Sequence, residues 1–325
     1  MRARRPAFAY GLEKHPRWRE NGAMEIEVLV NDWEGYRLLD SGGGRKLEAF
    51  GDVRITRSEP KAWWRPALPE AEWRKAAAIF EDGGGREGRW RFPSPGTPRE
   101  WEARYSPPGR RDGAPLCLQL RFMENSKQVG LFPEQSPHWR WLAGNPPEFA
   151  SAPPPALLNL FGYTGAASLV AAASGWHVTH VDASRPAIAW GRRNAGLSGL
   201  SEAPLRWVLE DAVKFVQREV RRGNRYDAIL LDPPAFGRGP DGELWKIERD
   251  LPPLLENCRR LLSDRASLVL LTVYTIDASS ILCHNLLRQM AEGLGGTLRI
   301  GELAHREESG GRLLPLSLWG RWERR

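Results

Sequence analysis

Apolar and polar residues are arranged along the second half of the chain in a pattern that predicts strands and helices in turn. Short apolar runs predict buried strands at residues 157–161, 177–181, 205–209, 227–231, 266–272, 298–303 and 313–319. Amphipathic stretches between these runs predict helices near residues 165–174, 185–197, 211–222, 246–262 and 279–292. Strands that alternate with helices are typical of a parallel α/β sheet built from βαβ crossovers.

The last two predicted strands are joined only by Ala304 to Arg312, which is too short for a crossover helix. They must therefore pair as an antiparallel hairpin. A seven-stranded Rossmann-like sheet, mostly parallel and ending in such a hairpin, is typical of a class I methyltransferase. A dinucleotide dehydrogenase would instead continue with parallel units.

The first half of the chain has shorter alternations and more turn residues. Strands are expected at 26–30, 36–40 and 116–122 and a short helix at 71–80, whereas the Arg-, Pro- and Gly-rich residues 1–24 predict a loosely ordered arm. We therefore expect a smaller, mainly β (α+β) substrate-recognition domain over residues 1–145 and a methyltransferase domain over residues 146–325. Consecutive prolines between 146 and 155 make that stretch the best linker.

Charge and aromatic content permit a nucleic-acid partner without demonstrating one. The net charge is +7, but basic residues exceed acidic ones only slightly in either half of the chain. Nine of the fifteen tryptophans lie at or before Trp141, several beside arginine, as in Trp63-Trp64-Arg65 and Trp139-Arg140-Trp141. Such rings can stack on unpaired bases, or they can fill the thin core of a small β domain.

Cysteine usage and hydropathy indicate the compartment. Cys117, Cys258 and Cys283 share no metal-type spacing and cannot all pair, which predicts a reducing environment and no metal site. The basic N-terminus lacks the apolar stretch of a secretory signal, and the longest apolar run, 266–276, is too short to span a bilayer. We expect a cytoplasmic protein with no membrane partner, and leave open whether it is a monomer or a homodimer.

Three strand ends carry candidate chemistry. Gly162 and Gly165 bracket a turn after the first strand, where missing side chains let the backbone approach a ligand or simply permit tight packing. Asp182 follows the second strand and can accept hydrogen bonds from both hydroxyls of an adenosine ribose, or it can cap the next helix. Asp211 after the third strand can bind the adenine amino group, with the helix cap again as the alternative.

The fourth strand ends in Asp232-Pro233-Pro234-Ala235-Phe236, the most specific motif in the chain. Two prolines remove backbone donors and stiffen the turn, so that carbonyls can face a substrate amine while Phe236 stacks on a planar base. Residues 237–242 predict a mobile loop, and Arg238, Lys246 and Arg249 are candidates for phosphate contacts or for ordinary solvent-facing cations.

Together these motifs make residues from about 115 to 320 resemble the S-adenosylmethionine (SAM)-dependent methyltransferases related to the bacterial 23S ribosomal RNA large-subunit enzymes, of both the cytosine-C5 and the guanine-N7 types. The matching pieces include 130–135, 159–165, 181–184, 210–212 with Phe215, 232–236 and 249–251. The resemblance implies SAM as cofactor, RNA as the partner and rRNA processing as the role. Residues 1–110 show no recognisable RNA-binding PUA module, which the RNA enzymes of the family often carry.

The resemblance fails at one catalytic position. Cytosine-C5 enzymes of the family use a cysteine after the fifth strand, where this chain reads Leu271-Thr272-Val273-Tyr274-Thr275-Ile276. Carbon C5 of cytosine needs a thiolate at C6 before it can accept a methyl group, whereas a base nitrogen already has a lone pair. The sequence therefore favours nitrogen over carbon as the acceptor.

These considerations define the expected site of a SAM-dependent methyltransferase acting on a base, most simply in ribosomal RNA. A protein or small-molecule substrate, or a catalytically silent RNA-binding protein with a relict pocket, are the alternatives. The expected catalytic residues are Asp232, Pro233 and Phe236. The expected cofactor contacts are Asn159, Phe161, Gly162, Tyr163, Thr164, Gly165, Asp182, Ala183, Ser184, Asp211, Ala212 and Asp232. The expected substrate contacts are Phe236, Arg238, Lys246 and Arg249.

Overall fold

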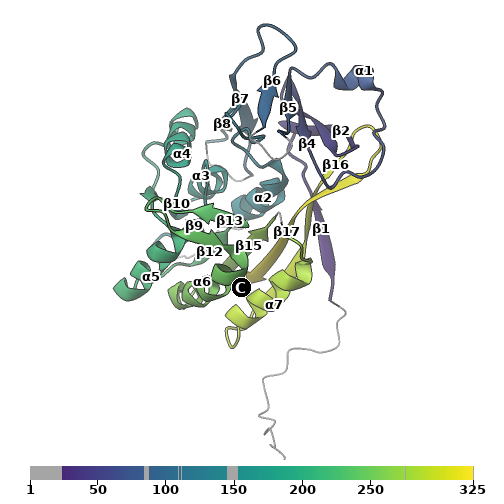
Figure 1. Ribbon diagram of the computed structural model, residues 1–325. Coiled ribbons are helices and arrows are strands. Elements are labelled where there is room, and N and C mark those ends of the chain that lie inside the picture. Colours follow the sequence, from purple (N-terminus) through teal and green to yellow (C-terminus); the bar gives the residue numbers. More distant parts are fainter. Residues whose placement is uncertain are drawn as a thin grey trace, which may run out of the picture.

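A computed structural model describes residues 24–83, 88–108, 110, 112–144, 153–274 and 276–324. Its centre is a twisted eight-stranded sheet (Figure 1). In spatial order, the strands are β1 (Ile26–Val30), β16 (Thr297–Arg306), β17 (Leu313–Glu323), β15 (Leu268–Val273), β12 (Ala228–Leu231), β9 (Ala156–Leu160), β10 (His177–Asp182) and β11 (Leu205–Leu209). Strand β17 is antiparallel to both of its neighbours, and the other pairings are parallel.

The methyltransferase-type sheet and its C-terminal antiparallel hairpin are confirmed. Helices cover both faces, as the crossovers require (Figure 1). One face carries α2 (Ser136–Gly144), α3 (Ala166–Ala173) and α4 (Arg185–Leu197), and the other carries α5 (Ala212–Arg222), α6 (Ile247–Leu261) and α7 (Ser280–Met290). Each side has its own apolar core, and β9 contributes Leu157 to one core and Leu158 to the other. This double burial explains why β9 is apolar on both faces apart from Asn159.

The sheet has eight strands where seven were predicted, because β1 adds to its edge. β1 belongs to the first half of the chain, yet it pairs in parallel with β16, with Ile26 opposite Ile300. Arg299 of β16 holds this edge through a bidentate ion pair with Glu27, at 2.6 and 2.7 Å. The pairing of β1 could not be predicted, because its partner strand lies more than 270 positions away in the sequence.

A separate five-stranded sheet lies above the large one in Figure 1. It consists of β2 (Tyr36–Gly42), β3 (Arg45–Phe50), β4 (Val53–Ser58), β5 (Ala78–Glu81) and β6 (Arg89–Arg91). A two-stranded ribbon of β7 (Glu100–Tyr105) and β8 (Leu116–Arg121) packs beside α4. The tip of the β16–β17 hairpin reaches this smaller sheet, where Glu308 donates its backbone N–H to the carbonyl of Leu38.

The helix predicted at 71–80 is wrong for most of its length. The structure has only a short α1 (Glu70–Trp73), followed by strand β5. Ala78 and Ile79 pair with Ile55 and Thr56 of β4, so sheet hydrogen bonds override the local helical preference.

The predicted domain boundary at 145/146, most of the predicted linker and nearly all of the N-terminal arm lie outside the described residues. The division into two domains therefore stays a prediction. None of the helices that the structure describes has the length and apolar character needed to cross a membrane.

Candidate active site

A cavity of about 350 Å³ opens at the carboxyl ends of β9, β10, β11 and β12. Ligands bind at this edge of open α/β sheets. Three carboxylates predicted from separate strand ends, Asp182, Asp211 and Asp232, line this one cavity. Predicted residues that also line it are Phe161, Tyr163, Ala183, Ser184, Ala212 and Arg238.

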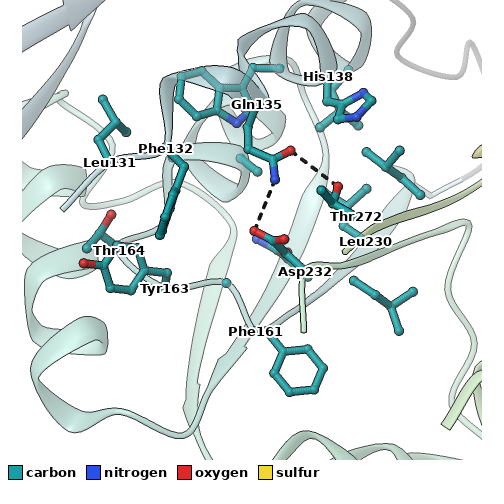
Figure 2. Close-up of a pocket in the computed structure, with 18 residues that line it drawn as sticks. Leu131, Phe132, Gln135, His138, Phe161, Tyr163, Thr164, Leu230, Asp232 and Thr272 are labelled. Atoms are coloured by element: carbon teal, nitrogen blue, oxygen red, sulfur yellow. Dashed lines mark hydrogen bonds between the residues drawn. The ribbon is translucent and has the colours of Figure 1, made fainter. Parts of the chain in front are cut away.

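A smaller cavity of about 70 Å³ adjoins the first and shares Asp232, Phe161 and Tyr163 with it (Figure 2). Asn159, Gly162 and Thr164 line only this smaller space. Asn159 uses its amide to donate to Ser168 Oγ, at 2.8 Å. Gly165 and Pro233 line neither cavity.

The glycines of the first turn make room for buried side chains. A Cβ on Gly162 would lie 2.4 Å from the ring of His180, and a Cβ on Gly165 would lie 2.9 Å from Trp207. Left-handed backbone falls on Gly165 (φ 87°) but also on Phe161 (φ 58°) and Tyr163 (φ 51°). Positive φ at side-chain-bearing residues costs free energy and concentrates at functional sites, so this turn is strained where it faces the cavity.

We expect Gly162→Ala to lower the free energy of unfolding by about 2–3 kcal/mol, because the added methyl group overpacks a closed site. His180 is fully buried. Removing its ring in Gly162→Ala/His180→Ala should recover part of the loss relative to the sum of the two single variants. Chemical denaturation of the four proteins measures this coupling, and strictly additive losses would contradict the steric explanation.

Asp182 is held by the backbone around it. Its Oδ2 accepts the N–H of Tyr163 and its Oδ1 accepts the N–H of Ser184, both at 2.8 Å. Burial raises the pKa of Asp182, and the two amide hydrogen bonds partly offset that effect. Ser184 caps α4 by accepting from Ala187 N, so Asp182 is not the helix cap. Its remaining lone pairs are available to hydroxyl groups of a ligand.

Asp211 combines the two roles considered for it. Its Oδ1 caps α5 by accepting from Lys214 N at 3.0 Å, while the residue also lines the cavity beside Ala212. The neighbouring Glu210 is instead paired with Arg218. The cap fixes the carboxylate in position, which suits a group that must meet a planar ligand edge.

Asp232 is the most perturbed carboxyl group in the site. Its Oδ2 accepts from Gln135 Nε2 at 3.2 Å, and Gln135 Oε1 lies 3.5 Å from the hydroxyl of Thr272 (Figure 2). Its Oδ1 is buried and has no hydrogen-bond partner within the described residues. Burial, together with the nearby charge of Glu134, raises the pKa of Asp232 to about 8. The carboxyl group therefore holds a proton at neutral pH in the free protein, and a bound cation would favour its charged form.

Aromatic side chains that the sequence did not assign to the site form part of the cavity wall. The ring of Phe132 lies 5.4 Å from that of Tyr163 and 6.2 Å from that of Tyr274. Tyr274 belongs to the stretch 271–276, where the resemblance would place a cysteine, and burial raises its pKa. Phe132 and Gln135 belong to a stretch already noted for its resemblance, but their approach to the cavity depends on tertiary packing.

Of the loop predicted at 237–242, residues 237–238 belong instead to an antiparallel hairpin of β13 (Phe236–Arg238) and β14 (Leu244–Lys246), and residues 239–242 form the turn of that hairpin. Its inner face is held by Trp245, which donates to the carbonyl of Pro234 at 2.6 Å and packs on Phe161. Sheet pairing across a glycine-rich turn thus orders a segment whose composition predicts a loop.

The outer face of this hairpin is exposed and carries the predicted substrate residues. Phe236 is 55% exposed and lies opposite Lys246, and Arg238 lies opposite the half-exposed Leu244. Arg249 differs from the other cations because it forms a bidentate pair with Asp250, at 2.7 and 2.8 Å. Arg238 and Lys246 are therefore better placed than Arg249 to meet a phosphate.

The cavity fits an adenosine cofactor with a cationic end. Its volume lies in the range of small-molecule sites. Asp182 and Asp211 line it with carboxylate acceptors, and Asp232 has a buried oxygen without a hydrogen-bond partner among the described residues. Among the described residues, no group of three or more His, Cys, Asp or Glu side chains is arranged to hold a metal ion.

Comparison with solved structures decides the family. The chain is 44% identical to a SAM-dependent methyltransferase from Agrobacterium tumefaciens, with a TM-score of 0.84 over 95% of this chain and 98% of that one. The chain belongs to the SAM-dependent methyltransferases. A Streptococcus mutans protein, 16% identical with a TM-score of 0.65 over 89% of this chain and 75% of that one, shares the fold of this methyltransferase. No protein-family model matches the present chain.

Curated relatives match a shorter part of this methyltransferase. A ribosomal RNA large subunit methyltransferase K/L from Hahella chejuensis is 42% identical over 114 residues, which is 34% of this chain and 15% of that protein. Its counterpart from Cellvibrio japonicus is 35% identical over 134 residues, 40% of this chain and 17% of that one. The matched region thus spans about a sixth of the length of these relatives.

Proposed function

We propose that this SAM-dependent methyltransferase methylates a base in RNA, with ribosomal RNA as the first candidate. The observation that supports this most is the hairpin β13–β14, which borders the cofactor cavity and exposes an aromatic ring and two cations. An aromatic face stacks on an unpaired base and cations bind phosphate, so the surface suits a single-stranded nucleic acid. The names of the curated relatives agree with this substrate.

The residues of the chain divide the work in this proposal. Asp182 and Asp211 orient the adenosine part of the cofactor, which supplies an electrophilic methyl group when bound. Asp232 holds the amino end of the cofactor or the acceptor amine, and Gln135 fixes the carboxyl in position. Phe236 stacks on the target base, and the stiff Pro233-Pro234 turn aligns it with the methyl group.

A nitrogen acceptor remains the better proposal. All three cysteines lie within the described residues and none lines the cavity. Burial raises the thiol pKa values of Cys258 and Cys283, which leaves these groups protonated. Without a thiolate beside the base, carbon C5 of cytosine cannot be activated. We further propose that residues 1–145 recognise the substrate and that the enzyme works in the cytoplasm.

Isotope-labelled methyl transfer tests the proposal. Ribosomal RNA from a strain that lacks this gene should become labelled by the purified enzyme and SAM, whereas RNA from the parent strain should not. Label found in protein or in small molecules instead would show that the enzyme acts on one of these substrates and not on RNA. Absence of label in every fraction would contradict the enzymatic role.

Phe236→Ala should lower kcat/KM for RNA by about 5- to 150-fold, because base stacking contributes about 1–3 kcal/mol. The dissociation constant for SAM should stay the same, since Phe236 does not line the cavity. Leu244→Ala, on the same hairpin face, is the matched control for lost apolar area. Equal losses in the two variants would argue against stacking.

A further inference from the structure

Tryptophan 63 is the outlier among the aromatic residues of the first half. Of the eight tryptophans from Trp33 to Trp141, seven pack into or against the hydrophobic core, as expected for a small β domain. Trp63 is 89% exposed. A ring with this exposure contributes nothing to the core, and its large apolar face is free to contact a partner.

The side chains around Trp63 alternate between the interior and the surface. Lys61, Trp63 and Arg65 are exposed, whereas Ala62 is fully buried and Trp64 is partly buried. We call Lys61, Trp63 and Arg65 the surface strip. It presents a cation, an aromatic ring and a second cation in sequence along one irregular segment, in which Trp63 N donates to the carbonyl of Lys61 at 3.1 Å.

The backbone beneath the surface strip is held firmly by the turn between β2 and β3. Gly43 N donates to the carbonyl of Trp64 at 2.7 Å, and Gly44 N donates to the carbonyl of Ala62 at 2.9 Å. Gly42 must lack a side chain here, because a Cβ would lie 2.5 Å from Pro66 N. The strip is therefore preorganised, which lowers the entropy lost when a partner binds.

Charge at the surface strip suits an anionic partner. Residues 60–69 contain no acidic residue. The carboxylates packed beneath it are buried and already bonded: Glu307 accepts from Arg312 Nε at 2.6 Å and Asp40 accepts from Leu68 N at 2.8 Å. The exposed charges of the strip itself are both positive, and the Lys61 ammonium also donates one hydrogen bond to the carbonyl of Leu316, which leaves two of its three donors for a ligand.

We propose that the surface strip binds single-stranded RNA outside the target nucleotide, with one base stacked on Trp63 and flanking phosphates on Lys61 and Arg65. The inference rests on the proposed RNA substrate and adds a second contact, since none of residues 60–69 lines the cofactor cavity. Proteins that bind unpaired strands combine aromatic rings for the bases with cations for the phosphates, and the strip offers both. Every base has a face that can stack on the ring.

Binding of polyuridylate and of ribosomal RNA tests the inference. Trp63→Ala should weaken both by about 5- to 150-fold, and Trp63→Tyr should restore most of the affinity. Lys61→Gln and Arg65→Gln should each lower the slope of log affinity against log salt by about 0.7. Arg288→Gln, an exposed cation on α7, is the charge-matched control. SAM binding should not change in any of these variants, and thermal stability should not change in the Trp63 and Arg65 variants, whose side chains are exposed.

The outcomes separate the strip from the activity. If Trp63→Ala methylates RNA and binds it with the affinity of the wild type, the proposed role of the surface strip is wrong and the proposed function stands. If the wild-type enzyme neither binds nor methylates RNA, both proposals fall. Equal weakening by Trp63→Ala and Trp63→Tyr would also overturn the stacking role.

Discussion

Replacing Asp182 by alanine should weaken SAM binding by about 100-fold or more. In the proposed binding mode the carboxylate accepts two ribose hydroxyls, and each hydrogen bond to a charged group contributes about 1.5–3 kcal/mol. The substitution also leaves the N–H groups of Tyr163 and Ser184 without their acceptor, so the strained turn loses its support. Isothermal titration calorimetry with SAM measures the loss directly.

The control for this experiment is Glu256→Ala, which removes an exposed carboxylate from α6 outside the cavity. Both substitutions remove one carboxylate, so any long-range effect of the altered net charge on SAM binding is the same in the two variants. Circular dichroism on Asp182→Ala separates lost contacts from lost folding. Unchanged SAM affinity in a folded Asp182→Ala protein would show that this carboxylate does not hold the cofactor's ribose.

Asp232→Asn should produce a pH-dependent loss of cofactor affinity. Burial and Glu134 raise the pKa of Asp232 to about 8, so the free protein holds this carboxyl protonated at neutral pH. A cationic ligand prefers the carboxylate, and binding below pH 8 must release the proton. The contribution of Asp232 should therefore grow up to about tenfold per pH unit toward pH 8 and level off above it.

The ratio of dissociation constants, Asp232→Asn over wild type, isolates this effect because titration of SAM itself cancels. The ratio should be near one at pH 6 and largest above pH 8. The same shift predicts that the contribution of Asp232 to the free energy of unfolding falls as pH rises from about 4 to about 8, since the folded state keeps a proton that the unfolded chain releases. A ratio independent of pH would show that Asp232 carries no charge toward the ligand.

Much of the large sheet and its cofactor edge could be predicted because the information is local. β11 and α4 agree with the predicted bounds residue for residue, since apolar periodicity and the Ser184 cap define them. The carboxylates at 182, 211 and 232 meet in one cavity because the carboxyl ends of neighbouring parallel strands share an edge.

What could not be predicted depends on partners distant in sequence. Gln135 reaches Asp232 across 97 positions, and Tyr274 enters the wall only when β15 lies beside β12. Gly162 looked like a ligand-facing glycine, yet the side chain it must avoid, His180, lies on the next strand. The sequence could not distinguish Trp63 from the seven tryptophans that pack on the core. Which ring is exposed depends on how the chain packs, and this leaves no signal in the local sequence.

A crystal structure with S-adenosylhomocysteine would test the central proposition most directly. We expect Asp182 to lie within hydrogen-bonding distance of both ribose hydroxyls. The adenine should lie beside Asp211 and Ala212, and the sulfur should point toward Asp232 and the proline turn. Ligand density outside this cavity, or a ribose turned away from Asp182, would contradict it.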